Sequence, residues 1–281
     1  MSRNISSASK SPVKKFIEYK GGDGHFEYYD KEKKERIEIS LPLTFIVLDD
    51  TRMTVTGFND ESNSGIYSNE VGKPSGSLRV KSHRGGIIAE GPWDKIKDKV
   101  TSKNVGGRYC KVVYAIVKTD NTEDHPSGWE YVAFKFDGAA IGAWFEFSGS
   151  ADLMDYGVKI VDEFIDAKKG KTEYKVPVFE SVRLSKDSVA VADKMYGPLK
   201  EYFQRYDSRD LDEVESGSGF PKEEFSGDEP EKSSQFSNFD KPTKDPFAKD
   251  TKDAKDEPAS RVRETSEGTR NVNVSDDDLP F

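Results

Sequence analysis

The chain ends on residues that could recognise a partner without forming a covalent bond. Three consecutive carboxylates precede an apolar residue, a proline that fixes φ and a terminal aromatic ring: Asp276, Asp277, Asp278, Leu279, Pro280 and Phe281. An aromatic anchor with a charged surround has the composition of a binding hot spot. Acidic tails often serve only to keep a chain in solution, but solubility does not explain an exposed terminal phenylalanine. We therefore interpret residues 275–281, the tip, as a partner-binding ligand.

A second set of residues could contact nucleic acid, because cations suit phosphates and aromatic rings suit base stacking. Strand-like alternation groups them on polar faces, as where Trp129 and Tyr131 lie opposite Val132 and Phe134. Core packing is an equally good interpretation of any one ring, and the cations could form an ordinary solvated face. The candidates are Arg79, Lys81, His83, Arg84, Tyr109, Lys111, Trp129, Tyr131, Lys135 and Trp144.

The tip resembles the C-terminal tip of the bacterial single-stranded DNA-binding proteins (SSB), in which an aspartate run precedes Ile or Leu, Pro and a final Phe. The resemblance covers residues 276–281. It implies that Phe281 fills a pocket on replication, recombination and repair enzymes, while the aspartates provide an electrostatic arm. The upstream chain lacks the pattern of ordinary bacterial SSB, which suggests a divergent protein encoded by a phage or mobile element.

Motifs of common enzyme classes are absent: GxxxxGK[ST], GxGxxG, GxSxG, HExxH and CxxC do not occur. The residues that could bind zinc, His25, His83, His125 and Cys110, are dispersed along the chain. We predict no enzymatic activity, no metal and no cofactor, although the numerous carboxylates leave a two-metal nuclease open.

Charge divides the chain. Residues 207–281 carry 21 acidic and 11 basic residues, a net charge of −10, while the whole chain carries −9. The acidic segment has too few aliphatic residues to bury the surface that ordering requires. We predict a flexible basic arm at 1–15, an OB-like body that binds single-stranded DNA at 16–206, a disordered acidic linker at 207–274 and the tip at 275–281.

Cysteine usage and hydropathy indicate the compartment. The single cysteine, Cys110, excludes an intramolecular disulfide and favours a reducing environment. No apolar run resembles a signal or membrane-spanning segment. We predict a cytoplasmic protein, of a bacterial cell or of a phage-infected host, with no membrane partner.

The hydrophobic pattern predicts a body made mainly of strands. The expected elements are a hairpin (37–48 and 51–58), a long loop (59–77), a strand (78–84), a short helix (93–100), a three-stranded meander (109–118, 129–136 and 141–147), a helix (151–165), a strand (174–184) and a helix broken near Gly197-Pro198 (188–206). No helical segment of ten residues lies between the strands of the meander, which argues against a parallel doubly wound sheet. We predict an α+β, mainly β fold: an antiparallel barrel with helical additions, followed by a disordered acidic tail. The resemblance of the tip to SSB implies that this barrel is OB-like.

These observations favour a protein that coats and protects single-stranded DNA and recruits replication, recombination and repair proteins through its tip. Two alternatives stay open. One is an adaptor of another fold class that uses the tip without binding DNA, and the other is an RNA-binding module. A homo-oligomer is compatible with each alternative.

Overall fold

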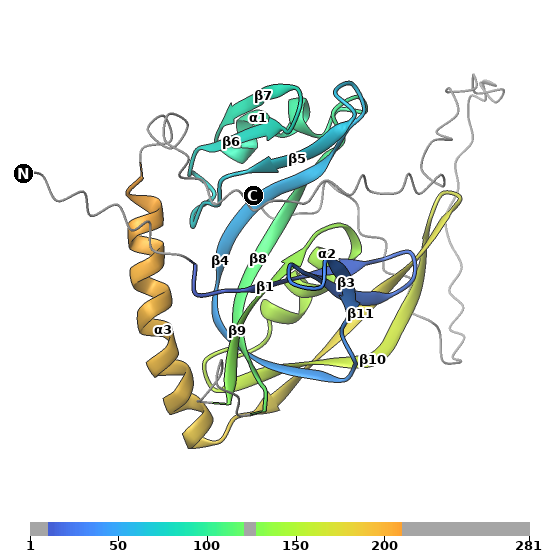
Figure 1. The fold of residues 1–281 in the computed structure, drawn as a ribbon. Coiled ribbons are helices and arrows are strands. Elements are labelled where there is room, and N and C mark those ends of the chain that lie inside the picture. Colours follow the sequence, from blue (N-terminus) through green and yellow to red (C-terminus); the bar gives the residue numbers. More distant parts are fainter. Residues whose placement is uncertain (1–10, 121–127, 210–281) are drawn as a thin grey trace, which may run out of the picture. The chain divides into compact units, whose positions relative to one another are not determined.

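The computed structural model describes residues 11–120 and 128–209 (Figure 1). The tip, most of the acidic linker and the first ten residues lie outside this part of the chain. The strands are β1 (Lys15–Lys20), β2 (His25–Asp30), β3 (Glu35–Glu38), β4 (Leu43–Asn59), β5 (Ser64–Ser68), β6 (Leu78–Ser82), β7 (Gly86–Gly91), β8 (Gly107–Lys118), β9 (Trp129–Phe136), β10 (Tyr156–Lys169) and β11 (Thr172–Arg183). The helices are α1 (Trp93–Val100), α2 (Gly138–Ser148) and α3 (Lys186–Asp207).

The strands form one mixed sheet, which confirms the prediction of a mainly β fold. Its main order is β3-β2-β1-β9-β8-β4-β5-β6-β7, and β1 runs parallel to β9 while the other pairs are antiparallel. The long strand β4 divides the sheet. Its first residues pair with the β10–β11 hairpin, and its last residues pair with β5.

The sheet does not close into the expected antiparallel barrel, and its β1–β9 pair is parallel. Strand β11 comes back only as far as the β1–β2 turn, where the Lys175 N–H donates to the Gly21 carbonyl at 2.8 Å and the Tyr19 hydroxyl donates to the Lys175 carbonyl at 2.8 Å. Pro177 lies two residues after Lys175 on the same edge of β11, and it has no N–H that could extend the pairing between β11 and β1. The ring of strands therefore stays open.

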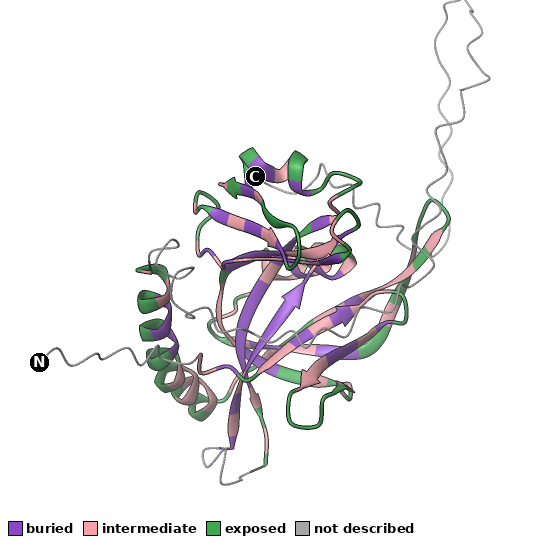
Figure 2. Ribbon diagram, turned by 45° about the horizontal axis from the view of Figure 1, so that its top comes forward, coloured by how far each residue is buried: buried purple, intermediate pink, exposed green. Residues whose placement is uncertain are grey.

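The buried residues, purple in Figure 2, form two cores on the two faces of the sheet. The main core fills the inner face and includes the fully buried rings of Phe45, Phe134, Phe136 and Trp144, with α1 and α2 packed on it. The second core lies between α3 and the opposite face of the sheet, and Leu199 of α3 is fully buried there. Both faces of the central strands β8 and β9 are thus covered along most of their length, and most of their residues are buried.

The predicted hairpin at 37–58 is wrong, because 43–59 is one continuous strand. Asp49 and Asp50, interpreted as a turn, lie at irregularities of the β4–β8 register between Val47 and Arg52. A bulge bends a strand without reversing it, so a polar pair can interrupt the alternation and leave the strand running on. The expected loop at 59–77 likewise contains a strand, β5.

Two further predictions are wrong, because a predicted strand is a helix and a predicted helix is a strand. Residues 141–147, predicted as a strand, belong to α2, whose buried residues Ala140, Ile141 and Trp144 have helical spacing. Residues 151–165, predicted as a helix, contain most of β10. The register of β10 shifts between Ile160 and Phe164, and Val161 is buried beside Ile160. Because of this shift, the apolar residues of β10 do not alternate strictly, and their spacing in the sequence resembles that of a helix.

The described helices and strands begin at Lys15 and end at Asp207. The arm was expected to reach residue 15, but Val13 is buried in the second core and β1 begins at Lys15. Helix α3 continues through Pro198 instead of breaking there. No helix within residues 11–120 and 128–209 has both the length and the apolar character needed to cross a membrane.

Candidate nucleic-acid interface

One row of register partners crosses four strands on the sheet face away from α1. Arg108 of β8 pairs with Thr56 of β4, Thr56 with Tyr67 of β5, and Tyr67 with Lys81 of β6. Directly paired residues project from the same side of a sheet. Strands lie about 4.8 Å apart, so the row spans about 14 Å and has a cation at each end and an aromatic ring between them.

A ring stack widens this row. The rings of Tyr67 and His83 are stacked, with centroids 4.7 Å apart and planes 28° from parallel. His83 is fixed by its backbone N–H, which donates to the Gly65 carbonyl at 3.0 Å. A Cβ at Gly65 would lie 3.2 Å from Cδ2 of His83, so glycine leaves room for the imidazole. Phe58 pairs with Gly65 and shares this side of the sheet.

The residues of the row alternate along their strands with core residues, so their side chains lie on the side of the sheet away from the main core. Val55, Ile66 and Val80 point to the opposite face, where they are buried in the main core with residues of α1. The row itself stays accessible, since the Arg108 side chain is 59% exposed and His83 is exposed. Arg108 has one long ion pair, with its Nη1 4.0 Å from the Asp137 carboxylate, and this contact is weaker than the two-pronged pair of Arg79 with Glu90. We call Phe58, Thr56, Tyr67, Lys81, His83 and Arg108 the stacking face.

The predicted cationic set at 79–84 lies at this face, but its members differ. Arg79 forms a two-pronged ion pair with Glu90, at 2.8 Å from Nε and 3.0 Å from Nη2. Its charge is therefore neutralised. Lys81 and His83 belong to the stacking face, and the exposed Arg84 follows them in the β6–β7 turn. Sequence alone brings these three together, because they share one strand and its turn.

Three of the other predicted residues belong to the inner side. Tyr109 is buried against Trp93, with ring centroids 5.4 Å apart. Lys111 has its Nζ 5.8 Å from the centre of the Phe145 ring, and burial lowers the pKa of its ammonium group while Asp50 and Asp49 oppose the shift. Trp144 is fully buried in α2, so its prediction as a solvent-facing strand residue is wrong.

The remaining predicted residues lie on β9. Val132 and Phe134 are core residues, as the strand parity predicted. The opposite side is not open to a ligand, however, because α3 covers it: the Tyr131 hydroxyl donates to the Met195 carbonyl at 2.8 Å. Lys135 is buried with its Nζ 4.9 Å from the centre of the Phe16 ring, and Trp129 is half-buried near the end of the strand. These residues do not join the stacking face.

Sequence reasoning missed Phe58, Thr56, Tyr67 and Arg108. Tyr67 was placed in the expected loop at 59–77, and Arg108 lies just before the predicted strand at 109–118. A signal for Tyr67 existed, since Ile66 and Tyr67 are the bulky residues of an otherwise polar segment. Their pairing partners on β4 and β6 could not be identified from alternation alone.

Cations on β1–β3 are already matched by carboxylates. The Arg36 Nη1 lies 2.6 Å from Glu27 and 3.5 Å from Glu18, and the Lys20 Nζ lies 3.4 Å from Glu27. Burial opposes ionisation of Glu27, but Lys20 and Arg36 outweigh it and hold the pKa of its carboxyl below the ordinary value. This part of the sheet is a structural ion cluster and offers phosphates little net positive charge.

Replacing Glu27 with glutamine should make the protein less sensitive to acid. A carboxyl whose pKa is lowered by folding stabilises the fold above its unfolded pKa, and this contribution disappears as the pH falls through the folded pKa. We expect Glu27→Gln to lower the free energy of unfolding by about 1 kcal/mol at neutral pH. Urea unfolding between neutral pH and pH 3 should show the difference shrinking. Glu32→Gln, in the exposed β2–β3 turn, is the control, and equal curves for both variants would contradict the assignment.

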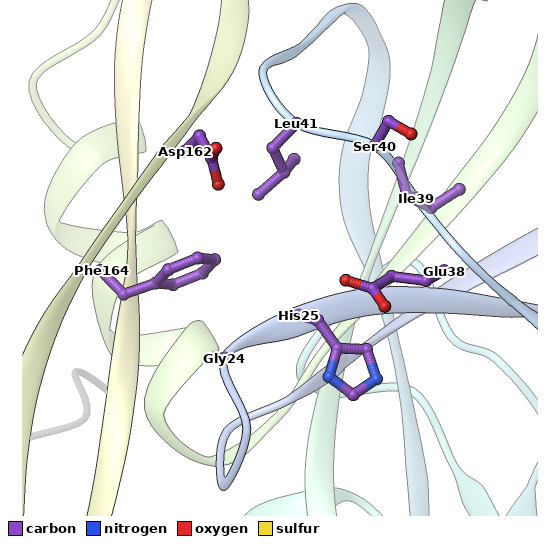
Figure 3. A pocket seen from close by; sticks show the side chains of 8 residues that line it. All are labelled: Gly24, His25, Glu38, Ile39, Ser40, Leu41, Asp162 and Phe164. Atoms are coloured by element: carbon purple, nitrogen blue, oxygen red, sulfur yellow. The ribbon is translucent and has the colours of Figure 1, made fainter.

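A hollow of about 400 Å³ lies between the β2–β3 end of the sheet and β10 (Figure 3). Glu38 and Asp162 both line it, with Phe164 and Leu41 as apolar walls. Two carboxylates disfavour a phosphate, so this hollow does not extend the nucleic-acid site. Gly24 is required at its rim, because its φ is +75° and a side chain there would collide with Lys175.

Within the described ranges, no group of three or more His, Cys, Asp or Glu side chains could hold a metal ion. Comparison with known proteins gives no match: no family model, no curated protein and no solved structure matches the chain. The stacking face is thus characterised by its own geometry, and the tip residues Asp276 to Phe281 lie outside the described residues.

Proposed function

We propose that this protein binds single-stranded DNA on the stacking face and recruits replication, recombination and repair proteins through its tip. The observation that carries the proposal is the row Arg108–Thr56–Tyr67–Lys81 with His83 stacked on Tyr67. Proteins that bind single strands without sequence preference combine aromatic rings for base stacking with cations along the phosphate path.

The chemistry of the face favours single strands over duplex DNA. Bases in a duplex are paired and stacked on each other, so a ring on a sheet can reach their faces only in an unpaired strand. Lys81 and Arg108, at the two ends of the row, suit phosphates on either side of a stacked base. The exposed Arg84 adds a cation beyond Lys81.

We also propose that strands β1, β9, β8, β4, β10 and β11 form a divergent OB-like arrangement. The hydrogen bond between Lys175 and Gly21 supports this, because it brings the last strand of the series to the first. OB-folds are themselves only partly closed barrels. The stacking face lies beyond this ring, on the sheet extension made by β5 and β6 together with the ends of β4 and β8.

Anisotropy of fluorescein-labelled oligo-dT, titrated with the full chain at low and high salt, tests the DNA-binding part. We expect salt-sensitive binding to oligo-dT and weak binding to duplex DNA. Equal binding to duplex DNA, or none to oligo-dT at low salt, would reject it. Tighter binding to oligo-U would favour the RNA alternative. Tryptophan quenching is less suitable, since Trp93 and Trp144 are buried in the main core.

Replacing Lys81 with alanine should weaken the salt dependence of oligo-dT binding. Each phosphate that is neutralised in a single strand contributes about 0.7 to the slope of log affinity against log salt. We expect the magnitude of that slope to fall by about 0.7 in Lys81→Ala. The matched control is Lys95→Ala, which removes an exposed lysine from α1 on the opposite side of this part of the sheet. An unchanged slope in Lys81→Ala would remove Lys81 from the phosphate path.

The tip proposal requires a separate measurement. Pull-down of bacterial replication and repair proteins by the full chain should be lost when Phe281 is deleted, because the ring is the proposed anchor. Retained capture would reject the tip as the recruiting element. Oligo-dT binding of the same variant reports independently on the folded body.

A further inference from the structure

We propose that the last turn of α3 is a latch that positions the stacking face. The latch consists of Arg52 on β4, Glu70 after β5, Tyr114 on β8, and Tyr206 and Asp207 at the end of α3. The inference rests on the proposed function, since its consequence is a change in nucleic-acid affinity. Its structural part, that the latch holds the β5–β6 loop, can be tested without any ligand.

The end of α3 is fixed to β4 by one buried cation. Arg52 donates from Nη1 and Nη2 to the two carboxylate oxygens of Asp207, at 2.6 and 2.9 Å. Its guanidinium also lies 4.0 Å from the centre of the Phe203 ring. Arg52 is 3% exposed and the Asp207 side chain is 52% exposed, so the pair is shielded from water on the arginine side only.

The same turn holds the loop that joins β5 to β6. The backbone N–H of Glu70 donates to the Tyr206 hydroxyl at 3.0 Å, and the Tyr114 hydroxyl donates to the Glu70 carboxylate at 2.6 Å. The first loop residue, Asn69, then fixes both loop ends to each other. It donates from Nδ2 to the Ser77 carbonyl at 3.0 Å and accepts from the Arg79 N–H at 2.7 Å.

This loop begins directly after β5, the strand that carries Tyr67 of the stacking face. Strand β5 pairs with β4 from Thr56 to Asn59, and at the next residue of β4 the Val55 N–H donates to the Ser68 hydroxyl at 2.9 Å. Backbone pairing returns in the loop itself, where Met53 and Val71 exchange two hydrogen bonds of 2.9 Å. Ser68 immediately follows Tyr67. The latch therefore acts on Glu70, between Ser68 and the Met53–Val71 bridge, and close to the residue whose ring it is proposed to orient.

The geometry also places the latch beside the face. Arg52, Thr54 and Thr56 are alternate residues of β4, and their register partners on β8 are Val112, Cys110 and Arg108. Tyr114 follows Val112 in the same alternation of β8. Alternate residues of a strand lie about 7 Å apart on one side of the sheet. The end of α3 therefore forms a wall next to the stacking face, and its position sets the shape of the path for a strand of DNA.

The experiment compares the full chain, Tyr206→Phe and Ser185→Ala. Tyr206→Phe removes the acceptor of the Glu70 N–H and keeps the aromatic ring. Ser185→Ala removes the N-cap of the same helix at its other end, where the serine side chain accepts from the Ser188 N–H. Each variant removes the hydrogen bonding of one hydroxyl at one end of α3, and the Ser185 hydroxyl also lies 2.9 Å from that of Ser188. Amide hydrogen exchange is measured over residues 69–77, and anisotropy is measured with fluorescein-labelled oligo-dT.

We expect faster exchange over residues 69–77 and about 2- to 10-fold weaker oligo-dT binding in Tyr206→Phe, the range that loss of one hydrogen bond gives. Ser185→Ala should change neither reading. Unchanged exchange at 69–77 in Tyr206→Phe would overturn the latch whether or not the protein binds DNA. Faster exchange with unchanged oligo-dT affinity would overturn its link to the stacking face. A full chain that binds no oligo-dT would instead reject the proposed function, and the exchange data would still decide on the loop.

Discussion

Replacing Tyr67 with alanine should lower the affinity for oligo-dT by about 5- to 150-fold, the loss expected when one base-stacking ring is removed. Tyr67 is the central ring of the row between Arg108 and Lys81, and it carries the stacked imidazole of His83. Removal of the Tyr67 ring deletes one stacking surface, and the His83 imidazole loses the ring against which it is stacked. Tyr67→Phe should retain most of the affinity, because the ring and not the hydroxyl provides the stacking.

The matched control is Tyr196→Ala, which removes an exposed tyrosine from α3. Anisotropy titrations at one fixed salt concentration compare the variants, and urea unfolding shows that each is folded. Equal affinity of Tyr67→Ala and the full chain would show that the stacking face does not hold the bases. A similar loss in Tyr196→Ala would place the interface on the other side of α3.

Replacing Trp144 with alanine should lower the free energy of unfolding by about 3–5 kcal/mol. The side chain is fully buried in α2 and packs on Phe136, with ring centroids 5.1 Å apart, and edge-on against Phe179, at 5.5 Å. Alanine leaves a large cavity among rings that come from different strands and cannot collapse together. Urea unfolding followed by far-ultraviolet circular dichroism measures the loss.

Trp144→Phe separates packing from hydrogen bonding. The indole N–H is buried and has no hydrogen-bond partner, and an unsatisfied buried donor costs about 1–3 kcal/mol. Phenylalanine loses some contact area but removes that cost, so its destabilisation should be well below that of alanine. A loss as large as that of Trp144→Ala would show that the missing volume dominates. Normal stability in Trp144→Ala would contradict the packing of α2 on the sheet.

Local alternation predicted several elements with correct type and nearly correct bounds. The helix at 93–100 and the strand at 129–136 coincide with α1 and β9, since their apolar residues follow a single period without interruption. The predictions failed where that period is interrupted. The register shifts in β4 made one bulged strand resemble a hairpin in the sequence. The register shift in β10 made that strand resemble a helix.

The sequence by itself determined that the body is mainly β, that the acidic charge is concentrated after residue 206, and that Lys81, His83 and Arg84 cluster. These properties depend on composition and on neighbours along one strand. Tertiary structure decided which faces are open. Strand parity correctly separated Tyr131 from Phe134, but α3 covers the polar side of β9, and only the pairing of β8, β4, β5 and β6 brings Arg108 to Tyr67. Alternation gives the side of a strand on which a residue lies, whereas long-range packing determines what covers that side.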